Sequence, residues 1–267
     1  MKVIRWGAGL AMALCTAAAA AVVAAPSALA ASGVEAVGLA ERGAQLASFN
    51  TADPTKVKLI GSVAGLDGDR LIGIDFRPKD HRLYGVSTRG RIYTLDPKTA
   101  KATEVGRLTT AIQGSYWDID FSAAGDFLRI VTDKGQNLRQ PFGANGPSGN
   151  TVKEGNLGRT PIAALAYTGS GQALAIDTGR SQVVSIDGAS GKVTPVGPAG
   201  AFGTISTSSN GLDVQGSSVF ATVNLNHYHT LFRVDPARGT VTKVGTFNPT
   251  GDGAESFRHV IDLTIRR

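Results

Sequence analysis

The sequence is poor in cysteine, histidine and aromatic residues, and each scarcity narrows what the chain can be. The only cysteine, Cys15, lies within the first thirty residues, so the rest of the chain cannot form an internal disulfide. A secreted domain of this length does not need one, because it can bury most of its apolar surface. Helical periodicity is nearly absent, while 34 glycines separate many short apolar runs. These features predict an all-β protein of short strands and tight turns.

Blocks of like charge and the motifs of common catalytic sites are also missing. Lysine and arginine are dispersed, and residues 31–267 keep a net charge of +4 once Lys2 and Arg5 are removed from the formal +6, so we expect no nucleic-acid partner. The chain has no G-x-S-x-G sequence, no P-loop and no dinucleotide-binding glycine pattern. Because the chain has only four histidines, general-base catalysis would fall to a carboxylate. We therefore favour a protein without enzymatic activity and keep catalysis as the alternative.

The one long apolar run, Leu10–Ala25, is typical of a secretory signal peptide. Two basic residues precede it, and Ala28-Leu29-Ala30 supplies the small side chains that a signal peptidase recognises. Pro26 ends the run too early for a good membrane span. We predict a signal peptide at residues 1–30 and a single domain at 31–267. The mature protein is then expected to be secreted or to stay in the cell envelope, with no membrane span.

The strongest signal in the chain is an internal repeat. A first-strand motif recurs in which Asp stands between two apolar residues, and Ala-Leu-Ala takes its place once. The central positions of the five copies are spaced 45, 45, 48 and 49 residues apart: Asp75, Asp120, Leu165, Asp213 and Asp262. In the complete copies, further short runs follow, separated by turns rich in Gly, Pro and Asp. Four strands at this period are typical of a β-propeller blade.

The ends of the chain predict how the ring of blades closes. Residues 34–61 supply a second, a third and a fourth strand, whereas residues 259–267 supply a first strand with nothing after it. Together the two partial units make one blade. Complete repeats begin near Leu71, Tyr116, Pro161 and Gly211. We therefore predict a monomeric propeller of five four-stranded blades, the closing one shared between the N- and C-terminal strands.

Two stretches of the chain resemble a known family. The pattern G-I-D-F-R-P…L-Y-G-V…G-R-I-Y-T-L-D-P-x-T…V-G spans Gly73–Gly106, and D-F…L-R-I-V-T-D-x-G-Q-N-L-R spans Asp120–Arg139. Both are similar to the family called domain of unknown function 4394, and the resemblance extends over about Val34 to Leu263. It implies an exported bacterial propeller with no assigned activity, so it gives no catalytic residues. The compact unit Pro161–Gly197, which lacks the first-strand Asp, departs from the pattern.

The repeated acids Asp75, Asp120, Asp213 and Asp262 would lie on the strands nearest the axis. A buried carboxylate there must be paired or hydrogen-bonded. The structural interpretation, which we favour, is that each accepts backbone N–H groups of an adjacent turn or blade. The alternative is a ring of carboxylates around a cation, with Ca²⁺ as the expected ion. Leu165 at the fifth position favours the structural interpretation.

The loops between second and third strands contain the candidate ligand-binding residues. In propellers these loops open on the same face as the loops between blades. One of them carries Asp133, Gln136, Asn137 and Arg139, which are suited to a sugar or another polar ligand. The interpretation that we favour is that Asp133 and Asn137 build the turn instead. The equivalent loop of the last complete blade carries Asn226, His227 and His229.

Two histidines without a cysteine or a placed carboxylate are a weak metal signal, so a polar-ligand contact or a solvated loop stays open for His227 and His229. We expect His259 to be structural and His81 to be exposed. The sequence as a whole favours an exported, non-catalytic propeller that binds a polar ligand, a glycan or another exported protein on one face. A calcium-dependent hydrolase or lactonase is the first alternative, by analogy of fold alone, and a structural scaffold is the second.

Overall fold

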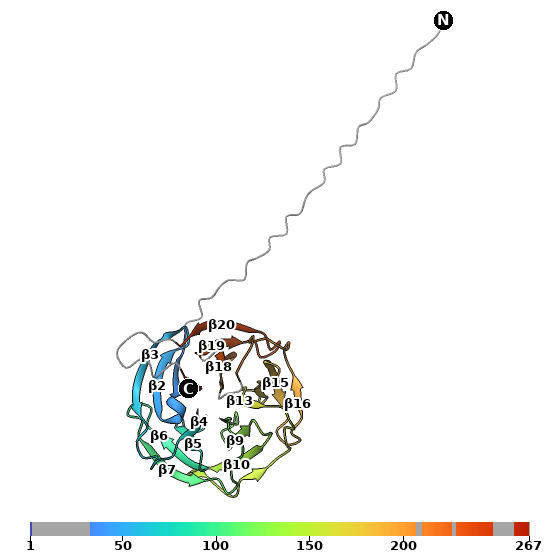
Figure 1. Cartoon of the computed structure of the whole chain (residues 1–267). Coiled ribbons are helices and arrows are strands. Elements are labelled where there is room, and N and C mark those ends of the chain that lie inside the picture. The colour runs from blue at the N-terminus through green and yellow to red at the C-terminus, as the bar shows by residue number, and fades with distance from the viewer. Residues whose placement is uncertain (2–32, 207–209, 226–227, 248–258, 267) are drawn as a thin grey trace. The chain divides into compact units, whose positions relative to one another are not determined.

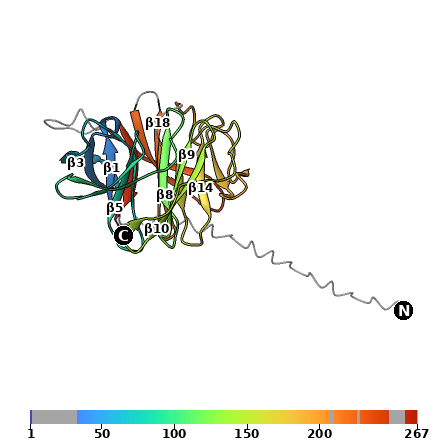
Figure 2. The same ribbon diagram turned by 90° about the horizontal axis from the view of Figure 1, so that it is seen from below.

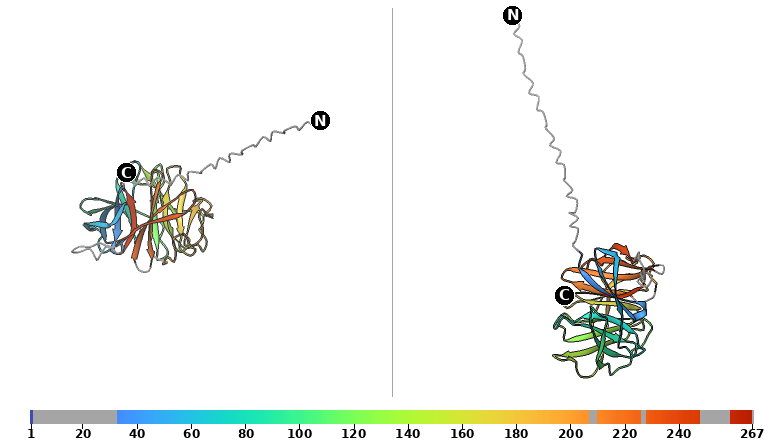
Figure 3. Two further views of the ribbon diagram at one scale, coloured as in Figure 1. Left: turned by 90° about the horizontal axis from the view of Figure 1, so that it is seen from above. Right: turned by 90° about the vertical axis from the view of Figure 1, so that its left-hand side faces the viewer.

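The computed structural model describes residue 1 and residues 33–206, 210–225, 228–247 and 259–266. Apart from Met1, the predicted signal peptide lies outside the described residues. Five antiparallel sheets stand around a common axis (Figure 1), and side views show them next to one another around the ring (Figures 2 and 3). The chain is therefore an all-β, five-bladed propeller, as the repeats predicted. Among the described residues, no helix has the length and apolar character needed to cross a membrane.

Blades 1 to 4 each start with their innermost strand and continue outward in chain order. Blade 1 consists of β4 (Leu71–Phe76), β5 (Leu83–Ser87), β6 (Arg91–Leu95) and β7 (Ala102–Arg107). Blade 2 consists of β8 (Trp117–Phe121), β9 (Phe127–Thr132), β10 (Asn137–Gly143), β11 (Gly146–Pro147) and β12 (Val152–Lys153). Blade 3 consists of β13 (Ile162–Tyr167), β14 (Ala173–Asp177), β15 (Gln182–Ile186) and β16 (Val193–Pro195). Blade 4 consists of β17 (Gly211–Gln215), β18 (Ser218–Leu225), β19 (Tyr228–Val234) and β20 (Val241–Thr246).

Blade 5 closes the ring with strands from both ends of the chain. Its innermost strand is β21 (Val260–Ile265), followed outward by β1 (Glu35–Ala40), β2 (Gln45–Asn50) and β3 (Asp53–Ser62). Strands β21 and β1 pair antiparallel with Leu263 opposite Gly38. A short 3-10 turn, η1 (Glu41–Gly43), connects β1 to β2. The predicted sharing of the closing blade is confirmed.

The outer edge of blade 2 differs from the repeat. The repeat predicted a single fourth strand in each blade, but in blade 2 two short strands, β11 and β12, pair with β10. Pro147 has no N–H to donate to the ladder, and Gly146 and Gly149 adopt left-handed backbone angles (φ 116° and 62°). The chain therefore leaves the sheet after β11 and rejoins it at β12.

Apolar side chains between the blades form the core. Five clusters of buried residues each combine side chains from two neighbouring sheets, and all six residues of β4 and of β13 are buried. Strands covered on both faces are apolar on both faces rather than alternating, which explains the apolar residues on either side of the Asp in the first-strand motif. Each fully buried aliphatic side chain contributes about 1.5–3 kcal/mol relative to exposure, so the packing of sheet on sheet holds the ring.

Candidate functional site

The repeated carboxylates join neighbouring inner strands around the axis. Asp75 on β4 accepts the backbone N–H of Phe121 on β8 (2.8 Å), and Asp120 on β8 accepts that of Tyr167 on β13 (3.0 Å). Two further bonds continue the ring: Ile265 N–H donates to Asp213 (2.5 Å), and Ile74 N–H donates to Asp262 (2.7 Å). All four acids are only 1–2% exposed. Each carboxylate thus holds the next blade through its backbone.

The junction between blades 3 and 4 is different. Leu165 stands where the other inner strands have Asp, and its own N–H donates to Asp118, two residues before Asp120 on β8 (2.7 Å). Blade 2 therefore sends two carboxylates to blade 3. Blades 3 and 4 are joined instead by a cluster of buried apolar side chains that includes Phe202 and Phe232, whose rings meet edge to face.

Several acidic side chains lie buried close together at the axis, where negative charge is unfavourable. Oxygen atoms of Asp75, Asp120 and Asp213 lie within 4.8 Å of one another, and they are the group among the described residues that could hold a cation. Burial, reinforced by the charges of Asp262 and Asp75, raises the pKa of Asp118 well above its usual value. Burial likewise raises the pKa of Asp262, against the lowering effect of the N–H groups it accepts. A carboxyl that stays protonated when buried avoids the cost of an unpaired charge.

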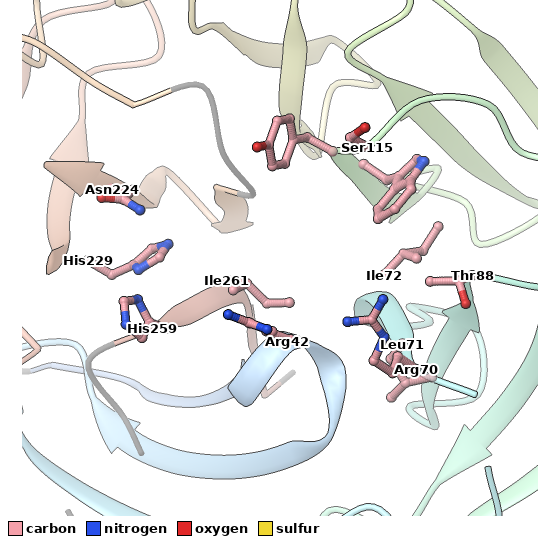
Figure 4. A pocket seen from close by; sticks show the side chains of 12 residues that line it. Arg42, Arg70, Leu71, Ile72, Thr88, Ser115, Asn224, His229, His259 and Ile261 are labelled. Carbon is pink, nitrogen blue, oxygen red and sulfur yellow. The ribbon is translucent and has the colours of Figure 1, made fainter. Parts of the chain in front are cut away.

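A cavity of about 780 Å³ opens at the end of the ring where β4, β8 and β21 begin (Figure 4). We call it the axial cavity, because described residues from four of the five blades contribute to its wall. Its residues come from η1, from the segments leading into inner strands, and from two hairpins: Arg42, Arg70, Leu71, Ile72, Thr88, Ser115, Tyr116, Trp117, Asn224, His229, His259 and Ile261. Polar and cationic groups ring the wall, and Leu71, Ile72 and Ile261 supply apolar surface.

A tight turn places Arg42 on this wall. Arg42 has a left-handed backbone conformation (φ 56°), which residues other than glycine rarely adopt. The next residue, Gly43 (φ 85°), packs so closely against β4 that a Cβ would lie 1.9 Å from the carbonyl oxygen of Leu71. Only glycine fits there, and its contact with Leu71 fixes η1 at the mouth of the axial cavity.

A buried carboxylate positions the second arginine. Asp69 accepts the backbone N–H of Arg70 (2.8 Å) and the hydroxyl of Thr88 (2.6 Å), and Thr88 N–H donates to the Arg70 carbonyl (2.8 Å). Burial alone would raise the pKa of Asp69, but hydrogen bonds from Ser87, Thr88 and the Arg70 N–H outweigh it and lower that pKa. Asp69 therefore stays ionised and holds Arg70 and Thr88 together on the wall.

Two of the predicted ligand-binding residues support the wall without lining it. Asp133 accepts the backbone N–H groups of Ser115 (2.9 Å) and Tyr116 (3.3 Å). Gln136 accepts from Gln113 N–H (2.8 Å) and donates to the carbonyl of Ala111 (2.9 Å). These bonds pin the segment 111–117 to the β9–β10 turn.

Asn137 and Arg139 lie in a different part of blade 2. Asn137 is 2% exposed, donates to the carbonyls of Gly155 (2.9 Å) and Gly188 (2.8 Å), and accepts from the buried Arg129. Arg139 donates to Glu154 (2.7 Å), which also binds Arg129 (2.7 Å). This network ties blade 2 to blade 3, and neither Asn137 nor Arg139 lines the axial cavity.

The predicted histidine loop does reach the axial cavity. His229 lies on β19 directly opposite Asn224 on β18, and both line the wall. His259, which we expected to be structural, is exposed and also lines the cavity, with its ring 5.8 Å from that of His229 at 87°. Figure 4 shows Asn224, His229 and His259 on one side of the opening. Asn226 and His227 lie outside the described residues, and His81 is exposed as expected.

Fold and site together define a five-bladed propeller with a polar cavity at one end of its axis. The chain belongs to the family described as "Domain of unknown function (DUF4394)", whose match covers residues 45–260. The resemblance drawn from the sequence is thereby confirmed. None of the curated proteins matches the chain.

Solved bacterial structures are similar in part. A protein of unknown function from Bacteroides thetaiotaomicron superimposes with a TM-score of 0.46 and 12% identity, over 65% of this chain and 42% of the other. A protein from Lactobacillus plantarum superimposes with a TM-score of 0.41 and 16% identity, over 83% of this chain and 69% of the other. The chain thus spans less than half the length of the first of these.

Sequence reasoning missed most of the wall. Arg42, Arg70 and Trp117 carry no motif, and they come from three segments that only the closed ring brings together. Two weak signals were present: a glycine after Arg42, and the turn Asp67-Gly68-Asp69 before Arg70. Both mark a backbone held in an unusual conformation beside an inner strand.

Proposed function

We propose that this protein is an exported, non-catalytic binding protein whose axial cavity takes a small polar ligand, such as a monosaccharide or the end of a glycan. A volume of about 780 Å³ lies within the range of cavities that bind small molecules. Loops held in place by Asp69, Asp133 and Gly43 make the wall, so it is pre-formed. A pre-formed wall favours binding because little conformational entropy is lost when the ligand enters.

One buried atom carries the proposal. Asn224 lines the cavity, and its side-chain oxygen is buried and has no hydrogen-bond partner within the described part of the chain. Leaving such an oxygen unpaired costs about 1–3 kcal/mol, so native proteins rarely do it without a partner from outside the chain. A ligand hydroxyl that donates to Asn224 would supply that partner once the amide group turns its oxygen toward the cavity.

The aromatic wall fits the same class of ligand. The indole N–H of Trp117 already donates to the Gln113 carbonyl (3.1 Å), so the apolar ring is what Trp117 contributes to the cavity. Sugars combine hydroxyl edges with apolar C–H faces, and an aromatic ring beside an amide and an arginine suits both.

We do not extend the proposal to a calcium-dependent hydrolase. The axial carboxylates are 1–2% exposed and already accept backbone N–H groups. A catalytic metal, in contrast, keeps a ligand position open to the substrate. The carboxylates therefore favour a role in holding the blades together.

A thermal-shift screen of residues 31–267 tests the proposal. We expect at least one of D-glucose, N-acetylglucosamine, D-glucuronate and D-glucose 6-phosphate to raise the melting temperature, because a ligand of the folded state stabilises it by mass action. Ser115→Trp, which fills the cavity from an exposed wall position, should abolish the shift. Ser170→Trp, at an exposed hairpin outside the cavity, should keep it. A screen without any shift, or a full shift in Ser115→Trp, would contradict the proposal.

A further inference from the structure

The axial cavity has a positive wall. Among the twelve wall residues within the described part of the chain there is no aspartate or glutamate, and there are two arginines and two histidines. Neither Arg42 nor Arg70 forms a side-chain ion pair within the described part of the chain, whereas Arg77, Arg91 and Arg129 all do. An arginine normally finds a carboxylate when one is near, since the planar guanidinium matches it with two hydrogen bonds. The guanidinium groups of Arg42 and Arg70 therefore stay available to a ligand.

Both arginines are held where a ligand would enter. Arg42 sits in a left-handed turn that the contact between Gly43 and Leu71 fixes. Arg70 is anchored through its backbone N–H by Asp69, whose carboxylate also takes the hydroxyl of Thr88. Figure 4 shows the two side chains on the side of the cavity opposite Ser115, with their guanidinium groups toward the open middle. Placement through the backbone leaves both guanidinium groups facing the cavity.

We propose that the ligand of the axial cavity carries an oxyanion, a carboxylate or a phosphate, that Arg42 and Arg70 bind. The inference rests on the proposed function and adds the chemical class of the ligand. The anion lies on the arginine side, and the hydroxyl groups of the same ligand face Asn224 across the opening. Charge-assisted hydrogen bonds to guanidinium are stronger than those between neutral groups, so the anion supplies a large part of the affinity.

Pairs of sugars that differ only in an anionic group separate the contribution of the charge to binding from that of the sugar ring. Isothermal titration of the mature protein at low salt compares D-glucuronate with D-glucose, and D-glucose 6-phosphate with D-glucose. We expect one anionic sugar to bind at least tenfold more tightly than glucose, and the stronger of the two distinguishes a carboxylate from a phosphate as the anion. The preference should shrink as NaCl is raised, because salt screens exposed charges.

Variants assign the charge to the two arginines. Arg42→Gln and Arg70→Gln should each weaken the preferred anionic sugar by about tenfold to a hundredfold, the range lost with one charge-assisted hydrogen-bond partner. The affinity for glucose should fall by a smaller factor than the affinity for the anionic sugar, because glucose carries no charge for the guanidinium groups to bind. Arg82→Gln removes the same charge from an exposed hairpin at the other end of β4 and should leave all affinities unchanged.

The outcomes separate the inference from the function on which it rests. Equal affinity for the neutral and anionic sugars, or unchanged anion affinity in Arg42→Gln and Arg70→Gln, would overturn the inference and leave the binding function in place. No binding of any sugar, with Ser115→Trp behaving like the natural protein, would overturn both.

Discussion

The backbone N–H of Ile74 donates to the carboxylate of Asp262, 188 residues later in the chain, at 2.7 Å. This bond joins the first complete blade to the strand that closes the ring. Asp262 is 2% exposed and also accepts the N–H of Leu263 at 2.7 Å. The carboxylate therefore satisfies two buried backbone groups on two different blades.

Removing this carboxylate should weaken the ring strongly. Asp262→Ala leaves two buried N–H groups without an acceptor, each costing about 1–3 kcal/mol, so we expect a loss of about 2–5 kcal/mol in the free energy of unfolding. Urea denaturation measures it. The control Asp67→Asn, whose side chain is 81% exposed, should change stability by less than about 0.5 kcal/mol. A loss below about 0.5 kcal/mol in Asp262→Ala would show that Asp262 does not hold the blades together.

The raised pKa of Asp118 has a defined consequence for stability against pH. A carboxyl whose pKa is raised in the folded state binds more protons folded than unfolded. Its contribution to stability is therefore greatest below the unfolded value of 3.8 and declines as pH rises toward the folded pKa. Relative to Asp118→Asn, the natural protein should lose up to about 1.4 kcal/mol per pH unit above that value. The measurement is the free energy of unfolding of both proteins from pH 4 to 7. If the difference between the two proteins does not change with pH, the pKa of Asp118 is not raised.

Asp133 should affect the cavity through the backbone it holds. Asp133→Ala removes the acceptor of Ser115 and Tyr116 N–H, so these two amides should exchange with deuterium faster, while amides in the middle of β9 keep their protection. Lys134→Ala, at the exposed neighbour in the same turn, is the matched control and should not change the exchange rate of the Ser115 or the Tyr116 amide. Unchanged exchange at Ser115 in Asp133→Ala would mean that something else holds this part of the wall.

The turn that carries Arg42 allows a paired glycine test. Gly43 and Gly68 both have left-handed backbones (φ 85° and 76°), but only at Gly43 would a Cβ collide, 1.9 Å from Leu71 O, whereas nothing lies within 4 Å at Gly68. Alanine at Gly68 should lower the free energy of unfolding by about 1 kcal/mol, the cost of a left-handed backbone for a residue with a Cβ. Alanine at Gly43 should cost at least about 2 kcal/mol more, because the turn must move off β4. Equal losses in thermal or urea unfolding would show that the turn yields easily.

The repeats predicted the blades because each inner strand solves the same physical problem. Asp75, Asp120, Asp213 and Asp262 recur at a similar spacing because four of the five blades present a carboxylate from this position to a neighbour's backbone. The ring closure followed from a missing first strand at one end and a lone one at the other. The outer edge of blade 2 was not predicted correctly, because turns at Gly146 and Gly149 break the strand locally.

The cavity wall was much harder to predict than the blades. Asn137 and Gln136 are rich in hydrogen-bonding groups, but whether these face a ligand depends on partners far along the chain, such as Gly188 and Ala111. Arg42 and Arg70 looked like ordinary surface residues, because the sequence does not show that they lack carboxylate partners. His229 was found because its loop is equivalent to the one expected to bind ligands in propellers.

A crystal structure of the protein soaked with the sugar that stabilises it most would test the central claim directly. The account predicts ligand density in the axial cavity, with a hydroxyl within hydrogen-bond distance of the Asn224 side-chain oxygen and the charged group beside Arg42 and Arg70. Ligand density anywhere else, for example in the groove beside Arg139, with the axial cavity holding only water, would contradict it.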